Sequence, residues 1–102
     1  MSTPTSDSHS LEQAHDLARR VGTAMFALDA ASKDTMGMEL LLCEPGHAVM
    51  RMTVHPPHLN GHQICHGGFI FTLADSTFAY ACNSRNQNTV ASGCSIEFLK
   101  PA

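Results

Sequence analysis

Two glycines that precede an apolar segment, and one acid inside that segment, are the residues of this sequence best suited to catalysis. Gly67 and Gly68 follow a polar loop, and Asp75 is the only acidic residue between Gly67 and Asn83. If the segment is a helix, its first N–H groups lack intrahelical partners and lie at the positive end of the helix dipole. Such a donor polarises an acyl carbonyl, and removing one from a comparable oxyanion site costs about 3 to 4 kcal/mol. The Gly67 N–H is therefore a candidate oxyanion donor.

Asp75 is the candidate general base or nucleophile. A carboxylate in an apolar helix is costly to bury unless it is paired or used, so a purely structural, paired role is the alternative. Eight residues separate Gly67 from Asp75, and a helix rises about 1.5 Å per residue, which places them about 12 Å apart along the axis. If both act on one acyl group, two antiparallel helices from two subunits must supply them. The spacing then predicts a homodimer with shared active sites.

The elements that position these residues follow from periodicity. Ser10 and Gln13 form a capping-box pattern before apolar residues at helical spacing, which predicts a helix over 11–28. Two short apolar runs, 38–43 and 48–54, are joined by a turn that contains Pro and Gly, which predicts a hairpin.

A loop then delivers the chain to the segment that carries Asp75. Residues 56–66 hold two prolines and no apolar period, whereas 67–83 is apolar on nearly every face, which predicts a helix wrapped by other structure. Residues 89–99 alternate as a strand does. The order predicts an α+β fold, with an antiparallel sheet curled around one long central helix.

Bulk properties limit the functions of this chain. It has 102 residues, enough for one domain, with 43% apolar and 15% charged residues. The net charge is −3 and the basic residues are scattered, so we expect no nucleic-acid partner.

Residues 1–10 are polar and predicted to be a disordered tail without signal-peptide features, ahead of a single domain over 11–102. No segment has the length of a membrane span, and four dispersed cysteines suit a reduced state, which predicts a cytoplasmic protein without membrane contact.

Three strings in the sequence resemble the PaaI-type hot-dog fold acyl-CoA thioesterases of phenylacetate degradation. The strings are His66-Gly67-Gly68 through Leu73-Ala74-Asp75, then Phe78 through Ser84, then Asn60-Gly61-His62-Gln63 upstream. Further similarity, in Val90-Ala91-Ser92 and Phe98-Leu99-Lys100-Pro101, extends the resemblance over most of 38–102.

The resemblance implies a hot-dog subunit that hydrolyses acyl-CoA thioesters, with phenylacetyl-CoA or hydroxyphenylacetyl-CoA as substrate. It implies catalytic roles for Asp75, Gly67, Asn60 and His66, and no metal or bound cofactor. Asp75 would activate water or attack the thioester, and Gly67 would polarise the carbonyl from the opposite subunit. Gly68, Thr77 and Phe69 are expected to contact the substrate. The expected assembly is a dimer or a homotetramer.

One departure from the family is visible in the sequence. Chains of that family continue past the position of Lys100 and Pro101 for several more strands, so this chain is expected to be truncated at its C-terminus. Two alternatives to an active enzyme therefore stay open. One is a non-catalytic acyl-CoA binding module of the same fold, and the other is an inactive fragment.

The loop before Gly67 holds residues that could instead bind a metal ion or act as a nucleophile. His55, His58, His62, Cys65 and His66 fall within twelve residues and carry ligand atoms that zinc favours. Their spacing fits no paired-ligand pattern, so we predict no metal site, and we interpret His66 as a residue that orders the loop. Cys65 is interpreted as a partly buried thiol rather than a nucleophile. The acids of the first half, Glu12, Asp16, Asp29 and Asp34, are predicted to be solvated surface.

Overall fold

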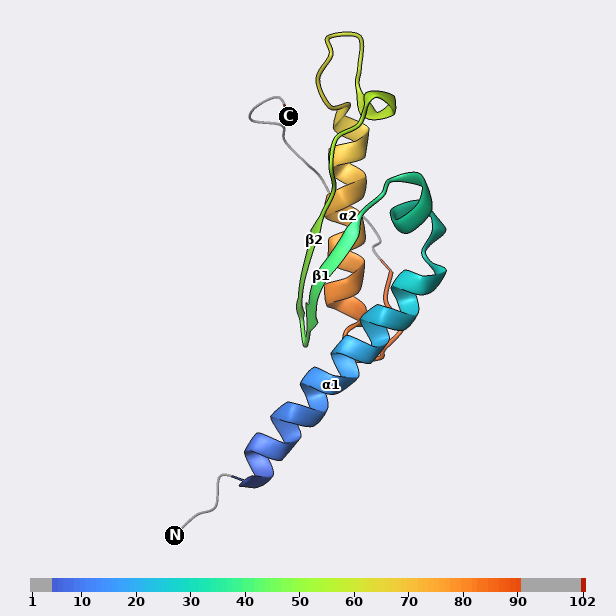
Figure 1. Cartoon of the computed structure of the whole chain (residues 1–102). Coiled ribbons are helices and arrows are strands. Elements are labelled where there is room, and N and C mark those ends of the chain that lie inside the picture. Colours follow the sequence, from blue (N-terminus) through green and yellow to red (C-terminus); the bar gives the residue numbers. More distant parts are fainter. Residues whose placement is uncertain (1–4, 91–101) are drawn as a thin grey trace.

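A computed structural model of the chain describes residues 5–90 and residue 102. In chain order the elements are helix α1 (Thr5–Leu28), a π-helical turn (Ala31–Thr35), strands β1 (Glu39–Glu44) and β2 (His47–Arg51), a 3-10 turn (Pro56–His58) and helix α2 (Gly67–Asn83). The hairpin runs alongside α2, and the N-terminal half of α1 projects away from the body (Figure 1). α1 contacts mainly β1, and α2 contacts mainly β2.

Helix α1 is longer than its sequence pattern predicts. It begins at Thr5, so the disordered tail over 1–10 is wrong for 5–10, and the capping box at Ser10 is wrong because Ser10 lies inside the helix. Gln13 bonds the His9 ring instead, 3.0 Å away. The polar residues of this turn have only slightly unfavourable helix propensities, so an established helix extends through them at small cost.

A close contact joins α1 to β1 at Gly22. A Cβ atom at Gly22 would lie 2.8 Å from the Cβ of Cys43, closer than two such atoms can approach. Only glycine therefore lets the helix lie this near the strand. Ala18, one turn earlier, is fully buried. This contact fixes where α1 crosses the sheet.

The predicted hairpin is confirmed. β1 pairs antiparallel with β2, from Glu39 opposite Arg51 to Glu44 opposite His47, with an irregularity between Leu40 and Leu42. Gly46 turns the chain with a φ of +71°, a conformation that favours glycine. Its N–H donates to the hydroxyl of Ser84, 2.7 Å away, which ties the turn to the end of α2.

The core is small and rich in methionine. Its buried members are Met36, Met38, Met50 and Tyr80, with partly buried apolar side chains from α1, the hairpin and α2 packed around them. Methionine is flexible and fills irregular gaps between helices and sheet. The core therefore holds the inner face of α2 against the hairpin.

The bounds predicted for α2 are those observed, but the helix is not wrapped on every side by the described residues. Phe78 is 53% exposed, and Asp75 is exposed as well. The strand predicted over 89–99 falls largely on residues 91–101, outside the described part of the chain, and residues 89 and 90 have no regular structure. The described sheet is the two-stranded hairpin.

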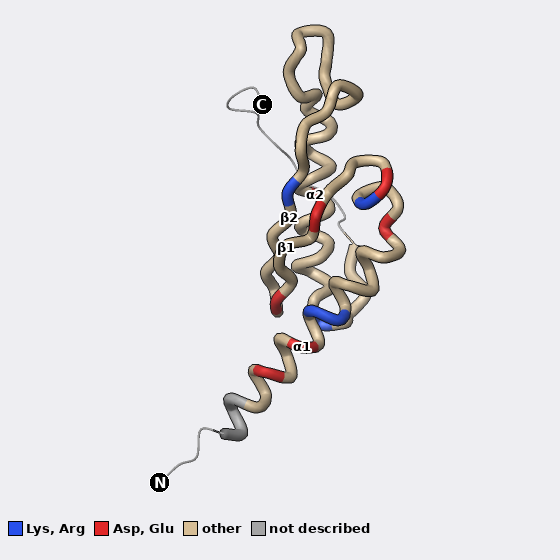
Figure 2. The backbone as a smooth tube through the Cα atoms, viewed as in Figure 1, with Lys and Arg blue, Asp and Glu red and all other residues tan. Residues whose placement is uncertain are grey.

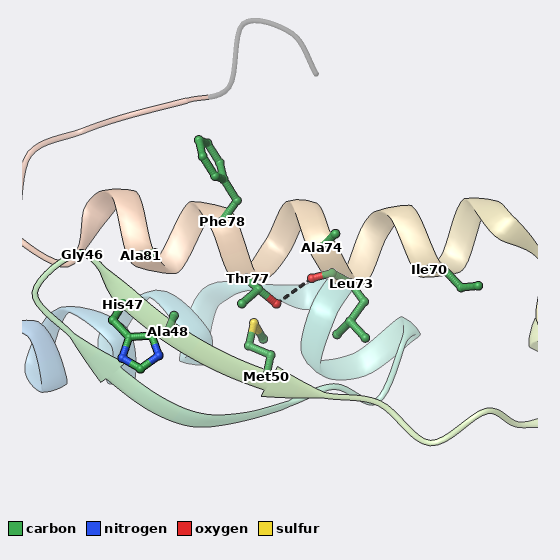
Figure 3. Close-up of a pocket in the computed structure, with 10 residues that line it drawn as sticks. All are labelled: Gly46, His47, Ala48, Met50, Ile70, Leu73, Ala74, Thr77, Phe78 and Ala81. Carbon is green, nitrogen blue, oxygen red and sulfur yellow. Dashed lines mark hydrogen bonds between the residues drawn. The ribbon is translucent and has the colours of Figure 1, made fainter. Parts of the chain in front are cut away.

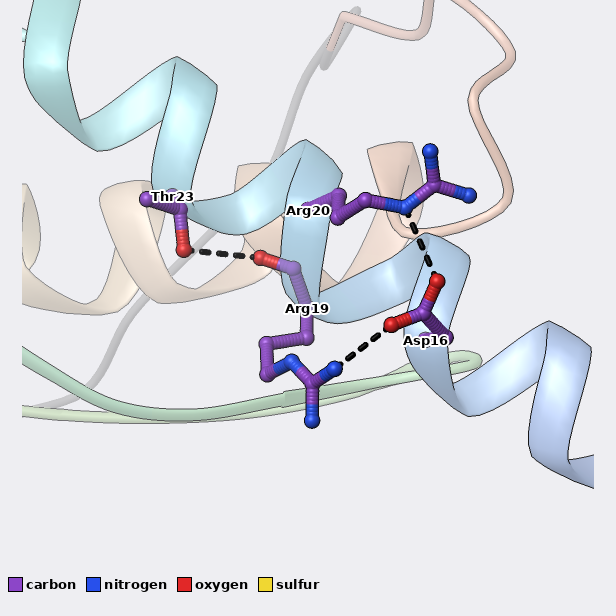
Figure 4. Close-up of polar contacts among 4 residues, drawn as sticks. All are labelled: Asp16, Arg19, Arg20 and Thr23. Carbon is purple, nitrogen blue, oxygen red and sulfur yellow. Dashed lines mark hydrogen bonds and ion pairs between the residues drawn. The ribbon is translucent and has the colours of Figure 1, made fainter.

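Charged residues are spread along the chain rather than gathered in one stripe (Figure 2). On α1, Asp16 lies between the guanidinium groups of Arg19 and Arg20, and the Thr23 hydroxyl donates to the Arg19 carbonyl (Figure 4). Exposed ion pairs of this kind contribute little to stability. Among the residues described, no helix has the length and apolar character needed to cross a membrane.

Candidate active site

The N-terminus of α2 is built around His66 and Gly67. His66 is the N-cap residue, and its Nδ1 accepts a hydrogen bond of 3.2 Å from the Gly68 N–H. The Gly67 N–H makes no hydrogen bond to any residue in the described part of the chain. It is therefore a donor at the positive end of a helix. At Gly68 an added Cβ would meet the His66 Nδ1 at 3.5 Å, so the glycine leaves the backbone of the first turn accessible from that side.

The preceding loop is held by its own hydrogen bonds. Asn60 Oδ1 accepts from the N–H groups of His62 (2.8 Å) and Ile64 (3.4 Å), and the Asn60 N–H donates to the Ile64 carbonyl (2.8 Å). The His66 N–H donates to the His58 carbonyl, 2.8 Å away. Asn60 thus directs its side-chain oxygen into the loop that leads to Gly67.

Asp75 lies on α2 about two turns after Gly67. Its side chain is exposed, and it forms no hydrogen bond or ion pair with another described residue. The described residues do not bury Asp75 as its apolar surroundings predict, and none of them pairs with it as the structural alternative requires. A hollow of about 270 Å³, named here the acid-side hollow, adjoins it. Its lining residues are Asp75, Phe78, Ala79, Cys82, Thr89 and Val90.

A larger hollow of about 520 Å³, named here the hairpin-side hollow, lies between β2 and α2 (Figure 3). Thr77 lines it, and the Thr77 hydroxyl donates to the Leu73 carbonyl at 2.7 Å. Phe78 points away from the hairpin, whereas Thr77 and Leu73 face it (Figure 3). Thr77 and Asp75 therefore lie on different flanks of α2, and one subunit does not bring them to one site.

Phe69, also predicted to contact substrate, packs toward the interior. Its ring lies 5.0 Å from the His58 ring and 6.3 Å from the His66 ring, centroid to centroid. It also packs against the buried core. Within this subunit Phe69 supports the loop and the first turn of α2.

Two alternatives concern the loop before α2: a metal site, and Cys65 as a nucleophile. In the part of the chain that the structure describes, no three His, Cys, Asp or Glu side chains are grouped to hold a metal ion. Cys65 is 4% exposed, and its thiol contacts the His66 carbonyl at 3.6 Å. Cys43, Cys65 and Cys82 are free thiols.

One cluster was not predicted from the sequence, and it corrects the interpretation of Asp29 as solvated surface. Asp29 is half-buried, and its carboxylate accepts from the Tyr80 hydroxyl (3.0 Å) and the Ser32 N–H (3.1 Å). Burial, then the Asp29 hydrogen bond and charge, raise the pKa of Tyr80 well above its ordinary value. The available signal was Tyr80 itself, because a tyrosine in an apolar helix requires a partner for its hydroxyl.

Comparisons with known proteins agree with this fold. The family model described as thioesterase superfamily matches residues 62–102. The structure of the Escherichia coli PaaI protein from the phenylacetic acid degradation operon superposes with a TM-score of 0.83 at 46% identity, covering 86% of this chain and 63% of that one. A mutant form of the phenylacetic acid degradation protein PaaI from Thermus thermophilus superposes with a TM-score of 0.64 at 39% identity, covering 68% of this chain and 59% of that one.

Residues 62–102 therefore match a thioesterase superfamily domain, and the chain has the α+β hot-dog fold. The chain is also similar to the acyl-coenzyme A thioesterase PaaI of Escherichia coli K12, with 51% identity over 78 residues, which are 76% of this chain and 55% of that protein. A putative esterase of Archaeoglobus fulgidus is 39% identical over 69 residues, 68% of this chain and 45% of that protein. The chain thus spans about half the length of the curated relatives it matches.

Proposed function

We propose that this chain is a subunit of an acyl-CoA thioesterase, which hydrolyses the thioester to a carboxylic acid and the free thiol of CoA. The Gly67 N–H polarises the acyl carbonyl, and Asp75 either removes a proton from the attacking water or attacks the carbonyl itself. In both routes the hydrolysis consumes one water, and the sulfur leaves with a proton.

The observation that carries this proposal is that α2 bears two polar groups without partners among the described residues. The Gly67 N–H has no hydrogen-bond partner among the described residues, and an exposed, unpaired Asp75 follows on the same helix. Elsewhere in the described chain, polar groups near this helix are engaged, as at Ser76, Thr77 and Tyr80. An unengaged donor and an unengaged carboxylate are the two groups that acyl transfer requires.

The active site is shared between subunits. Gly67 and Asp75 are about 12 Å apart along one helix axis, too far to act on one carbonyl. Two α2 helices lying antiparallel place the Gly67 of each opposite the Asp75 of the other and form two equivalent sites. A homodimer is thus the catalytic unit, and a homotetramer is the assembly expected for proteins of this type.

The other candidate residues serve these two groups. His66 caps α2 and fixes the direction of the Gly67 N–H, and Asn60 braces the loop from which both emerge. Gly68 leaves space for the acyl group beside the donor. Thr77 would contact a part of the substrate in the hairpin-side hollow, which lies on the flank of α2 away from the Asp75 of the same subunit. Phe69 supports the first turn of α2 from the interior.

Phenylacetyl-CoA and hydroxyphenylacetyl-CoA are the proposed substrates. Both of the related structures are of proteins from phenylacetic acid degradation. The acid-side hollow adds support, because Phe78 and Cys82 offer an aromatic and a soft surface next to Asp75. A cytoplasmic location stays a prediction from the sequence.

Steady-state release of free thiol from phenylacetyl-CoA tests the proposal. The purified protein and its Asp75→Asn variant are compared, with Asp34→Asn as the matched control on an exposed acid of the π-helical turn. Turnover that Asp75→Asn abolishes and Asp34→Asn preserves would support the thioesterase. Binding of acyl-CoA without turnover by the unaltered protein would replace it with a binding module.

Single turnover in oxygen-18 water separates the two roles of Asp75. Direct attack forms an anhydride, and water that then attacks its Asp75 carbonyl leaves label in the Asp75 carboxylate. General-base catalysis puts label only in the released acid.

A further inference from the structure

Two hydrogen bonds join the inner face of α2 to the segment that follows α1. The Tyr80 hydroxyl donates to Asp29 Oδ2 at 3.0 Å, and the hydroxyl oxygens of Ser32 and Ser76 are 2.8 Å apart, in hydrogen-bond contact. The Ser32 N–H donates to Asp29 Oδ1 at 3.1 Å, so the two residues that bond to α2 are also bonded to each other. Asp29 and Ser32 belong to the tight turn at the end of α1, far in sequence from α2.

The attachments lie where they control rotation of α2. Ser76 and Tyr80 are four residues apart, so they share one face of the helix, one turn from each other. Asp75 directly precedes Ser76 and projects about 100° around the axis from it. A helix held at two heights on one face cannot roll, and a roll is the motion that would turn the Asp75 carboxylate away from a substrate.

The cluster is buried enough to act as a rigid connection. Tyr80 and Ser32 are each 1% exposed, and Ser84, which ties the end of α2 to the hairpin turn, is fully buried. Buried hydrogen bonds that involve a charged acceptor are stronger and shorter than neutral ones at a surface. The Phe26 ring, 6.2 Å from the Tyr80 ring, adds packing on the same side.

We propose that Asp29, Ser32 and Tyr80 are positioning residues that hold α2 at the rotation in which Asp75 faces the acyl group. This role rests on the proposed thioesterase activity. None of the three touches the substrate. Their contribution is made through Ser76 and Tyr80 to the neighbouring Asp75, and it sets how often the carboxylate is within reach of the reacting carbon or water.

The variants Tyr80→Phe and Asp29→Asn test the role, since each removes or weakens the same hydrogen bond while keeping side-chain size. We expect kcat to fall about tenfold in each, because small misplacements of a catalytic group are costly, while KM for phenylacetyl-CoA stays unchanged. The double variant should lose no more than either single one, because both act on the same bond. Thr23→Val is the control, since it deletes an α1 hydroxyl that donates to the Arg19 carbonyl.

Assays run below the onset of each variant's thermal transition, so that unfolding does not contribute. Wild-type kcat in Tyr80→Phe and Asp29→Asn, with an active unaltered protein, would overturn the positioning role and leave the thioesterase standing. Equal loss in Thr23→Val would also overturn it. An inactive unaltered protein would overturn the proposed function, and the positioning role with it.

The hydrogen bond between Tyr80 and Asp29 can also be followed independently of activity. Tyr80 is the only tyrosine and the chain has no tryptophan, so near-ultraviolet phenolate absorbance reports this residue alone. In Asp29→Asn the phenol should ionise at lower pH than in the unaltered protein. An unchanged titration would show that Asp29 does not hold Tyr80, and would overturn the proposal whatever the kinetics.

Discussion

Two acids, one on α2 and one packed against it, differ in how their carboxylates are engaged. Asp29 is half-buried, and both of its oxygens accept hydrogen bonds, from the turn after α1 and from Tyr80. Asp75 is exposed and forms no hydrogen bond or ion pair with the described residues. A carboxylate whose oxygens are all engaged stabilises the fold, whereas one left unengaged on a fixed helix is available for chemistry.

The two flanks of α2 differ in the same way as these two acids. The inner flank is joined to the core through Phe69, Leu73 and Tyr80. The acid-side flank, with Phe78 and Asp75, faces outward from this subunit. An exposed phenylalanine beside an acid that pairs with none of the described residues is suited to contact with a second subunit and a ligand rather than with water.

The strongest test of the comparison is Asp75→Asn. We expect kcat for thioester hydrolysis to fall by about 10³-fold, since a positioned acid–base group contributes about 10²–10⁴. The free energy of unfolding should change by less than about 0.5 kcal/mol, because Asp75 has no described partner to lose. A stability loss comparable to that of a core substitution would show that Asp75 is structural after all.

Asp29→Asn should affect stability far more than Asp75→Asn does, and kcat far less. It replaces a carboxylate that accepts two hydrogen bonds, and we expect a stability loss of about 2 kcal/mol in urea unfolding. The urea midpoint should fall with an unchanged slope. If Asp29→Asn were as stable as the unaltered protein, the contrast between the two acids would not hold.

Alkaline pH should reduce the stability that Tyr80 contributes on the inner flank of α2. Because burial and Asp29 raise the pKa of Tyr80 in the folded state, its stabilising contribution is fully present below the ordinary tyrosine pKa of about 10 and is lost as pH rises above it. Burial also raises the pKa of the Cys43 thiol, which acts in the same direction. Tyr80→Phe should therefore reduce, without abolishing, the fall in urea midpoint on going to high pH. A pH dependence identical to that of the unaltered protein would contradict this.

The N-cap of α2 should have a smaller effect on stability. His66→Ala removes the acceptor for the Gly68 N–H, and such losses cost about 1 kcal/mol. His66→Asn supplies a short side-chain oxygen at the same position and should restore most of it. Equal stability of the three proteins in thermal unfolding would show that the cap is dispensable.

The smallest effect is expected at Asp16. Its ion pairs with Arg19 and Arg20 lie on the exposed face of α1, so Asp16→Asn should change the free energy of unfolding by less than about 0.5 kcal/mol. Thiol release should be unaffected. A larger loss would show that the projecting half of α1 is held by these pairs.

Local pattern alone determined several features of this protein. The bounds of α2, the position of Gly67 at its start and the hairpin follow from short-range signals: an apolar run without proline, glycines before it, and a Pro-Gly turn. The glycine and acid of the candidate site were identifiable for the same reason. A helix terminus and an acid in an apolar run are properties of neighbouring residues.

Tertiary structure decided the rest. Asp29 is engaged by Tyr80, which is 51 residues away in sequence, and the Ser32–Ser76 contact beside it spans 44 residues. No periodicity encodes such contacts. The extension of α1 to Thr5 and its approach to β1 at Gly22 likewise depend on an established helix and its packing partner. Sequence determines which groups could do chemistry, whereas packing determines which of them are already occupied, because engagement of a polar group is set by its neighbours in space.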